Sequence, residues 1–147
     1  MATARVLVVD DEPQVLSVVS KALATRGYEI HAASSPGQAL EAVERLPCFD
    51  LVVSDVIMPE MCGPELVRRI ERICPEVGVV LMSGNLRAEG IPARAVFLGK
   101  PFLLTDLYAT VDKALTRCRK GSYGDGGNGA EAGNQELSRS QFLKGSR

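Results

Sequence analysis

Five polar residues have the types and spacing of a site that handles phosphate. Asp10 and Asp11 directly follow the first short apolar run of the chain, and Asp55 ends the third. Three carboxylates brought together would repel one another, and a hard divalent cation such as Mg²⁺ relieves that repulsion while leaving room for a phosphate oxygen. Ser83 ends the fourth apolar run and Lys100 follows the fifth. A hydroxyl and an ammonium there would bind the remaining phosphate oxygens.

Short apolar runs recur along the first two thirds of the chain and predict five strands. Those runs are residues 5–9, 28–33, 50–54, 78–82 and 95–98. The first, third and fourth lack polar alternation, as strands do when both faces of their sheet are covered. The sequence therefore predicts a parallel sheet between layers of helices.

Helical periodicity fills the segments between these runs. Apolar residues recur at three and four positions before Gly27, which ends the first predicted helix. Ser35-Pro36 supplies an N-cap and a first-turn proline for the second helix. Gly63-Pro64 opens a third, and the last runs from about Thr105 to Arg119. Strand alternating with helix over about 120 residues predicts an open doubly wound α/β sheet, since a closed barrel needs about 250 residues.

The parallel arrangement also predicts where the chemistry lies. In such sheets ligands bind outside the carboxyl ends of the strands. Asp10, Asp11, Asp55, Ser83 and Lys100 all stand at or just after strand ends. We therefore expect them to converge at one edge of the sheet.

Composition restricts the choice of partners and of compartment. The 147 residues carry 17 basic and 18 acidic side chains, and a net charge of −1 favours neither nucleic acid nor an anionic membrane as partner. The apolar run 6–9 is too short for a secretory signal or a membrane span, so we expect a cytoplasmic protein. Residues 121–147 hold seven of the fourteen glycines, and we predict a disordered tail there.

The four cysteines form no metal-binding or redox motif in the sequence. Cys48, Cys62, Cys74 and Cys118 include no CxxC pair and no cluster with histidine. We expect them to be reduced thiols. Cys62 follows Asp55 by seven residues and is read as a small space-filling residue rather than a redox group.

Four segments together carry a family resemblance: LVVDDEP (7–13), LVVSDVIMPEMCGPELV (51–67), LMSG (81–84) and VFLGKPF (96–102). With them, residues 4–119 resemble a response-regulator receiver domain of two-component signalling systems. The resemblance implies a flavodoxin-like (βα)5 fold with strand order 2-1-3-4-5, with residues 1–120 as the receiver domain. It also implies phosphoryl transfer from a sensor histidine kinase or a histidine phosphotransfer protein, and output through contact with a downstream protein.

The same resemblance assigns roles to individual residues. Asp55 would be the phosphoacceptor, and Asp11 and Asp55 would bind Mg²⁺ directly. Asp10 would bind the ion through water, and the backbone carbonyl of Ile57 would complete the protein ligands. Transfer and slow hydrolysis would be self-catalysed, by positioning and charge neutralisation, so we expect no dedicated enzyme.

Three further residues would bind or respond to the phosphoryl group. Ser83 and Lys100 would hold its oxygens. Phe97 occupies the aromatic switch position of the family and would change rotamer when Ser83 is drawn inward.

Only sixteen residues separate Ser83 from Lys100, and they include Gly90 and Pro92, so the intervening helix has room for about two turns. We therefore expect that this chain does not form the usual dimer of the family through that helix.

Several alternatives stay open at this point. Asp10 and Asp11 could instead cap the helix that starts at Pro13. The chain could be the terminal receiver of a hybrid sensor histidine kinase, a phosphate-independent scaffold or a small aspartyl phosphohydrolase. A flavin-binding protein is disfavoured, because no Ser/Thr/Gly-rich phosphate loop follows the first strand. The single histidine, His31, falls in the second strand and is read as a packing residue.

Overall fold

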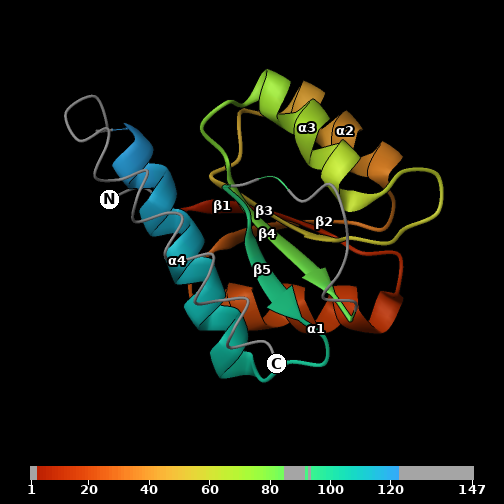
Figure 1. Ribbon diagram of the computed structural model, residues 1–147, viewed down its shortest axis with the longest axis vertical. Coiled ribbons are helices and arrows are strands. Elements are labelled where there is room, and N and C mark those ends of the chain that lie inside the picture. The colour runs from red at the N-terminus through yellow and green to blue at the C-terminus, as the bar shows by residue number, and fades with distance from the viewer. Residues whose placement is uncertain (1–2, 85–91, 93, 123–147) are drawn as a thin grey trace.

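The fold consists of a five-stranded parallel sheet between two layers of helices (Figure 1). The structure is a computed structural model and describes residues 3–84, 92 and 94–122. The strands, in sheet order β2-β1-β3-β4-β5, are β2 Glu29–Ala33, β1 Arg5–Val9, β3 Leu51–Asp55, β4 Gly78–Ser83 and β5 Val96–Gly99. This order confirms the predicted flavodoxin-like topology, and each strand lies within one residue of its predicted bounds.

The helices of the described residues cover both faces of the sheet. They are α1 Pro13–Thr25, α2 Pro36–Arg45, α3 Gly63–Ile73 and α4 Leu104–Ser122. Ser35 caps α2 as predicted, since its hydroxyl accepts the backbone N–H of Gln38 at 3.2 Å. The last helix includes Gly121 and Ser122, so it crosses the predicted domain boundary by two residues.

Two apolar cores lie on opposite faces of the sheet. Alternate strand residues such as Leu7 and Val52 pack toward α2 and α3. Their neighbours, such as Val8 and Val53, pack toward α1 and α4. Because side chains alternate across a strand, a strand buried on both faces has to be apolar throughout. The apolar runs in the sequence are therefore unbroken because helices cover both faces of the sheet.

The prediction of reduced thiols is wrong for two cysteines. Cys48 and Cys74 form a disulfide, with their Cα atoms 5.7 Å apart. Twenty-six residues separate them in the sequence, and only the packing of α3 beside the start of β3 brings them together. Cys62 is a free thiol and is exposed.

Two expectations fall outside the described residues. The short helix expected between Ser83 and Lys100, and with it the expected absence of a dimer, concerns residues 85–91 and 93. The disordered tail concerns residues 123–147.

Candidate functional site

The predicted site residues meet at the carboxyl ends of four neighbouring strands. Strand pairing sets Val9 beside Ser54 and Asp55 beside Met82, so the residues that follow β1 lie next to the end of β3. Ser83 ends β4 opposite Gly99 of β5, and the Lys100 N–H donates to the Ser83 carbonyl at 2.9 Å. The register of the sheet therefore assembles the site.

Three carboxylates form the centre of this acidic site. Asp10, Asp11 and Asp55 each offer one oxygen, and these oxygens lie within 4.8 Å of one another. Asp10 is fully buried, Asp55 is 7% exposed and Asp11 is exposed to solvent. The cluster is therefore open on one side, where a ligand could enter.

Lys100 is the cation that contacts these carboxylates. Its Nζ lies 3.1 Å from Asp10 Oδ2 and 3.2 Å from Asp55 Oδ1. It also lies 3.3 Å from Glu12 Oε1, an exposed partner that the sequence reading did not assign to the site. The sequence offered one indication that Glu12 could belong to the site, which is its place in the acidic run of residues 10–12. This ammonium contacts three carboxylates, and Asp11 makes a fourth in the site, which leaves the site with excess negative charge.

Burial and charge shift the ionisation of two groups. Burial raises the pKa of Asp55, and Asp10 and Asp11 raise it further, while Lys100 acts in the opposite direction without overcoming them. Burial alone would lower the pKa of Lys100, but the hydrogen bond and charge of Asp10, with the charge of Asp55, outweigh it and raise that pKa. The ammonium is therefore held in its charged form, and the Asp55 carboxylate lacks sufficient positive charge around it.

These donors fit a hard divalent cation such as Mg²⁺. They are carboxylate oxygens, two of the three carboxylates are buried, and the raised pKa of Asp55 shows that its negative charge is incompletely neutralised. Mg²⁺ is bound by one or two carboxylates together with waters and phosphate oxygens. Ile57 follows Asp55 by two residues in the loop toward α3, and the role of its carbonyl stays a prediction.

The loop after Asp55 folds back tightly against the strand. The Val56 N–H donates to the Met82 carbonyl at 2.9 Å, and the Gly63 N–H donates to the Val56 carbonyl at 2.7 Å. A Cβ atom on Gly63 would overlap with the Asp55 backbone carbonyl oxygen. The sequence reading used Gly63 only as the start of a helix, whereas its lack of a side chain lets α3 begin directly against the site.

The alternative role considered for Asp10, as a cap of α1, is not observed: the N-cap of α1 is Glu12, and no side chain caps that helix. Asp10 Oδ1 instead accepts the backbone N–H of Glu12 at 2.9 Å, in the turn before α1. Its Oδ2 contacts Lys100. Because the two oxygens have different partners, Asp10 holds this turn and faces the site at once.

The remaining predicted positions are buried or remote. Ser83 is 2% exposed, and Phe97 is 6% exposed within the core beneath α2 and α3. His31 is exposed on β2, with its ring centroid 6.0 Å from that of Phe49, away from the acidic site as expected.

Among the described residues, no helix combines the length and apolarity needed to cross a membrane.

Known proteins are similar to this chain in sequence and in fold. The family model of the response regulator receiver domain matches residues 6–112. The chain is 42% identical over 121 residues to the sensor kinase CckA of Brucella abortus, covering 78% of this chain and 13% of that protein. It is 32% identical to the response regulator receiver protein CpdR of the same organism, covering 76% of this chain and 96% of CpdR.

A solved structure leads to the same family. The crystal structure of the receiver domain from the hybrid histidine kinase CckA superposes with a TM-score of 0.65 at 34% identity, covering 76% of this chain and 99% of that chain. The chain therefore spans nearly all of two receiver proteins but only a small part of the longer sensor kinase. With the strand order and the acidic site, these matches show that the chain belongs to the response regulator receiver domains of two-component signalling systems.

Proposed function

We propose that Asp55 is the phosphoacceptor of this receiver domain, and that its phosphoryl group comes from a phosphohistidine of a sensor histidine kinase or a histidine phosphotransfer protein. The observation that carries the proposal is the position of the Asp55 carboxylate, 3.2 Å from Lys100 and within the cluster of three acidic side chains. An Asp55 oxygen attacks phosphorus, the P–N bond breaks, and its electron pair stays on the imidazole nitrogen.

The carboxylates have a second role in this proposal. Asp11 and Asp55 would hold Mg²⁺ directly, Asp10 would act through water, and the Ile57 carbonyl would be a further ligand. A Mg²⁺ ion bound there would supply positive charge for the transferring phosphoryl group. The excess negative charge around Asp55 supports this assignment, because that charge disfavours the reactive carboxylate form until a cation binds.

Lys100 and Ser83 would bind the phosphoryl oxygens. Lys100 already contacts the carboxylate that accepts the group, so its ammonium is within reach of an oxygen attached there. Ser83 ends the strand next to β3 and would donate its hydroxyl to another oxygen. Phe97 lies on the strand beyond it, and its rotamer would change as Ser83 moves. A Phe97→Tyr variant should change the phosphorylation-dependent shift of the aromatic resonance.

The signal would leave the domain through contact with a protein partner in the cytoplasm. A specific observation also favours a second placement, as the terminal receiver of a hybrid sensor kinase, since the 42% identity extends over the matched part of a sensor kinase. The two placements differ in back transfer. A terminal receiver in a relay should return its phosphoryl group to a histidine phosphotransfer protein, whereas an output receiver should lose it to water.

Intact-protein mass spectrometry tests the proposal. The chain is incubated with acetyl phosphate with and without Mg²⁺, beside an Asp55→Asn variant and an Asp112→Asn control that changes an exposed carboxylate on α4. We expect one phosphoryl increment that needs both Mg²⁺ and Asp55 and that survives in the control. An increment in Asp55→Asn would contradict the assignment. So would the absence of any increment together with no binding of beryllium fluoride, a stable phosphoryl mimic.

A further inference from the structure

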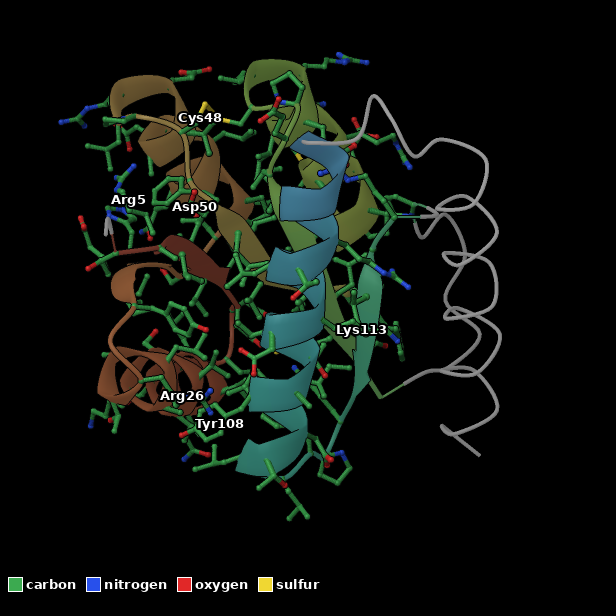
Figure 2. The ribbon with its side chains drawn as sticks, turned by 90° about the vertical axis from the view of Figure 1, so that its left-hand side faces the viewer. Arg5, Arg26, Cys48, Asp50, Tyr108 and Lys113 are labelled. Atoms are coloured by element: carbon green, nitrogen blue, oxygen red, sulfur yellow. A yellow bond between two sulfur atoms is a disulfide. The ribbon has the colours of Figure 1, made fainter. Side chains whose placement is uncertain are left out.

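The Cys48–Cys74 disulfide lies at the amino ends of the strands, opposite the acidic site. Cys48 precedes β3, and Cys74 is the C-cap of α3. Figure 2 shows Cys48 near Asp50, which directly precedes β3, and near Arg5, which begins β1 on this end of the molecule. The disulfide therefore joins the entry to the central strand with the far end of the helix that starts at the acidic site.

We propose that this pair is a reversible redox site that exchanges with low-molecular-weight thiols and dithiols, and that its state governs how firmly α3 is held. The inference rests on the proposed function in one respect. A domain served by histidine kinases works in the cytosol, where disulfides are usually transient or redox-sensing rather than structural.

The two sulfurs differ in a way that suits exchange. Cys48 is exposed, whereas Cys74 is 3% exposed. An attacking thiolate would therefore reach the Cys48 sulfur, form a mixed disulfide with it and release Cys74 as a thiolate, which takes up a proton. A second thiol of the reductant then displaces Cys48. The reductant ends as a disulfide and both cysteines end as thiols.

The backbone on each side of the disulfide has hydrogen bonds of its own. Arg5 Nη1 donates to the Pro47 carbonyl at 2.6 Å and to the Cys48 carbonyl at 3.1 Å, so the segment before β3 is held independently. The Cys74 N–H donates to the Ile70 carbonyl at 2.8 Å, which closes the last turn of α3 but does not attach that turn to the segment before β3. The Cys48 sulfur also lies 3.8 Å from the Ile73 carbonyl oxygen, an acceptor ready for the thiol form. Both redox states therefore have a satisfied local structure.

The helix α3 connects this pair to the acidic site. Its first residue, Gly63, packs against the Asp55 backbone carbonyl, and its C-cap is Cys74. Leu66, Val67 and Ile70 of the same helix are fully buried in one core. A packed helix moves as a unit, so releasing one end loosens the contact of the other with the loop after Asp55.

The first experiment measures the redox equilibrium of the full chain. In a Cys62→Ser/Cys118→Ser background, the protein is equilibrated in glutathione buffers of increasing reduced-to-oxidised ratio, alkylated and weighed. We expect both remaining thiols to appear together across the series without denaturant, while a further Cys74→Ser variant keeps its exposed Cys48 modifiable by glutathione at the oxidising end. A pair that stays reduced in every buffer, or that reduces only after unfolding, would overturn the proposal.

The second measurement tests the link to α3 by amide hydrogen exchange without Mg²⁺ or phosphate donor. We expect exchange in α3 and in residues 56–62 to be at least about tenfold faster in the reduced form, with α1 unchanged as the internal reference. Equal exchange in the two forms would overturn the role of α3. Because neither readout involves Asp55 chemistry, a failure of the proposed phosphorylation and a failure of this inference give different results.

Discussion

The two ends of the sheet hold their polar groups in different ways. At the carboxyl ends, Lys100 is shared by Asp10, Glu12 and Asp55, and the carboxylates stay crowded. At the amino ends, each arginine pairs with one carboxylate and two backbone carbonyls: Arg5 with Glu29 and the carbonyls of Pro47 and Cys48, and Arg94 with Glu71 and the carbonyls of Pro75 and Val77.

The comparison teaches that the two ends divide stability and function between them. At the amino ends, each of these two guanidiniums has one carboxylate and two neutral carbonyls as partners, so no excess charge is left, and a disulfide adds a covalent link. The carboxyl ends retain a charge imbalance that an incoming cation relieves. Functional sites commonly retain unfavourable local interactions that the rest of the fold compensates.

The largest expected effect concerns the close packing at the acidic site. Gly63→Ala would push a methyl group into the Asp55 carbonyl, and we expect it to lower the free energy of unfolding by about 2–3 kcal/mol. Urea denaturation measures the loss. The matched control is Gly37→Ala in α2, where the atom nearest to an added Cβ is the Ser35 hydroxyl oxygen, at 3.9 Å. Equal changes in the two variants would contradict the close approach at Gly63.

The next largest effect concerns the contacts of Arg5 at the amino ends of the strands. Arg5→Lys should cost about 1–2 kcal/mol, because an ammonium cannot bind both carbonyls with the same geometry or stack as well on Phe49, whose ring centroid lies 4.7 Å from the guanidinium carbon. Thermal and urea unfolding measure it. Arg45→Lys removes only an exposed contact with Glu41 and should change stability by less than about 0.5 kcal/mol.

Magnesium should act on the acidic end alone. At ten times its dissociation constant, Mg²⁺ should raise the free energy of unfolding by about 1.4 kcal/mol, the amount expected for one site that binds only the folded state. An Asp11→Asn variant should require a higher concentration for the same shift, and Asp112→Asn should match the parent chain. Equal stabilisation of all three proteins by Mg²⁺ would place the ion elsewhere.

The smallest effect tests the charge imbalance without any metal. Asp55→Asn should raise stability by roughly 1 kcal/mol at neutral pH in the presence of a chelator, because it removes a buried charge that its neighbours disfavour. A carboxyl whose pKa is raised on folding binds its proton more tightly in the folded state. As the pH rises from 3.8, the ordinary pKa of the carboxyl, to its raised pKa in the folded state, ionisation of Asp55 progressively lowers the free energy of unfolding. Above the raised pKa this loss of stability is complete and constant.

The pH dependence provides the control for that prediction. The gain in the free energy of unfolding of Asp55→Asn over the parent chain should be absent in acid. It should grow as the pH rises from 3.8 through the raised pKa of Asp55, and it should then stay constant. Unfolding measured across the range should show that pattern. A variant less stable than the parent at neutral pH would show that the contact with Lys100 outweighs burial and repulsion.

Particular residues show how far the sequence alone could lead. The apolar runs and the residues that follow them predicted the strands and the grouping of Asp10, Asp55 and Lys100, because parallel strands bring their carboxyl ends together, whereas the strand order was predicted from the family resemblance. Glu12 was missed because the acidic run of residues 10–12, although visible in the sequence, does not show which of its carboxylates contact Lys100. The role of Gly63 was also missed, because a close approach between a helix and a strand leaves no periodic signal.

The sequence by itself determined the layered fold and the chemistry of the acidic edge, since both follow from the local order of apolar and polar residues along each strand. Only the tertiary structure decided which distant segments meet. The disulfide between Cys48 and Cys74 depends on where α3 ends relative to β3, and the excess charge at Asp55 depends on burial and on how Lys100 divides its contacts. These are distances between groups far apart in the chain, and packing sets them.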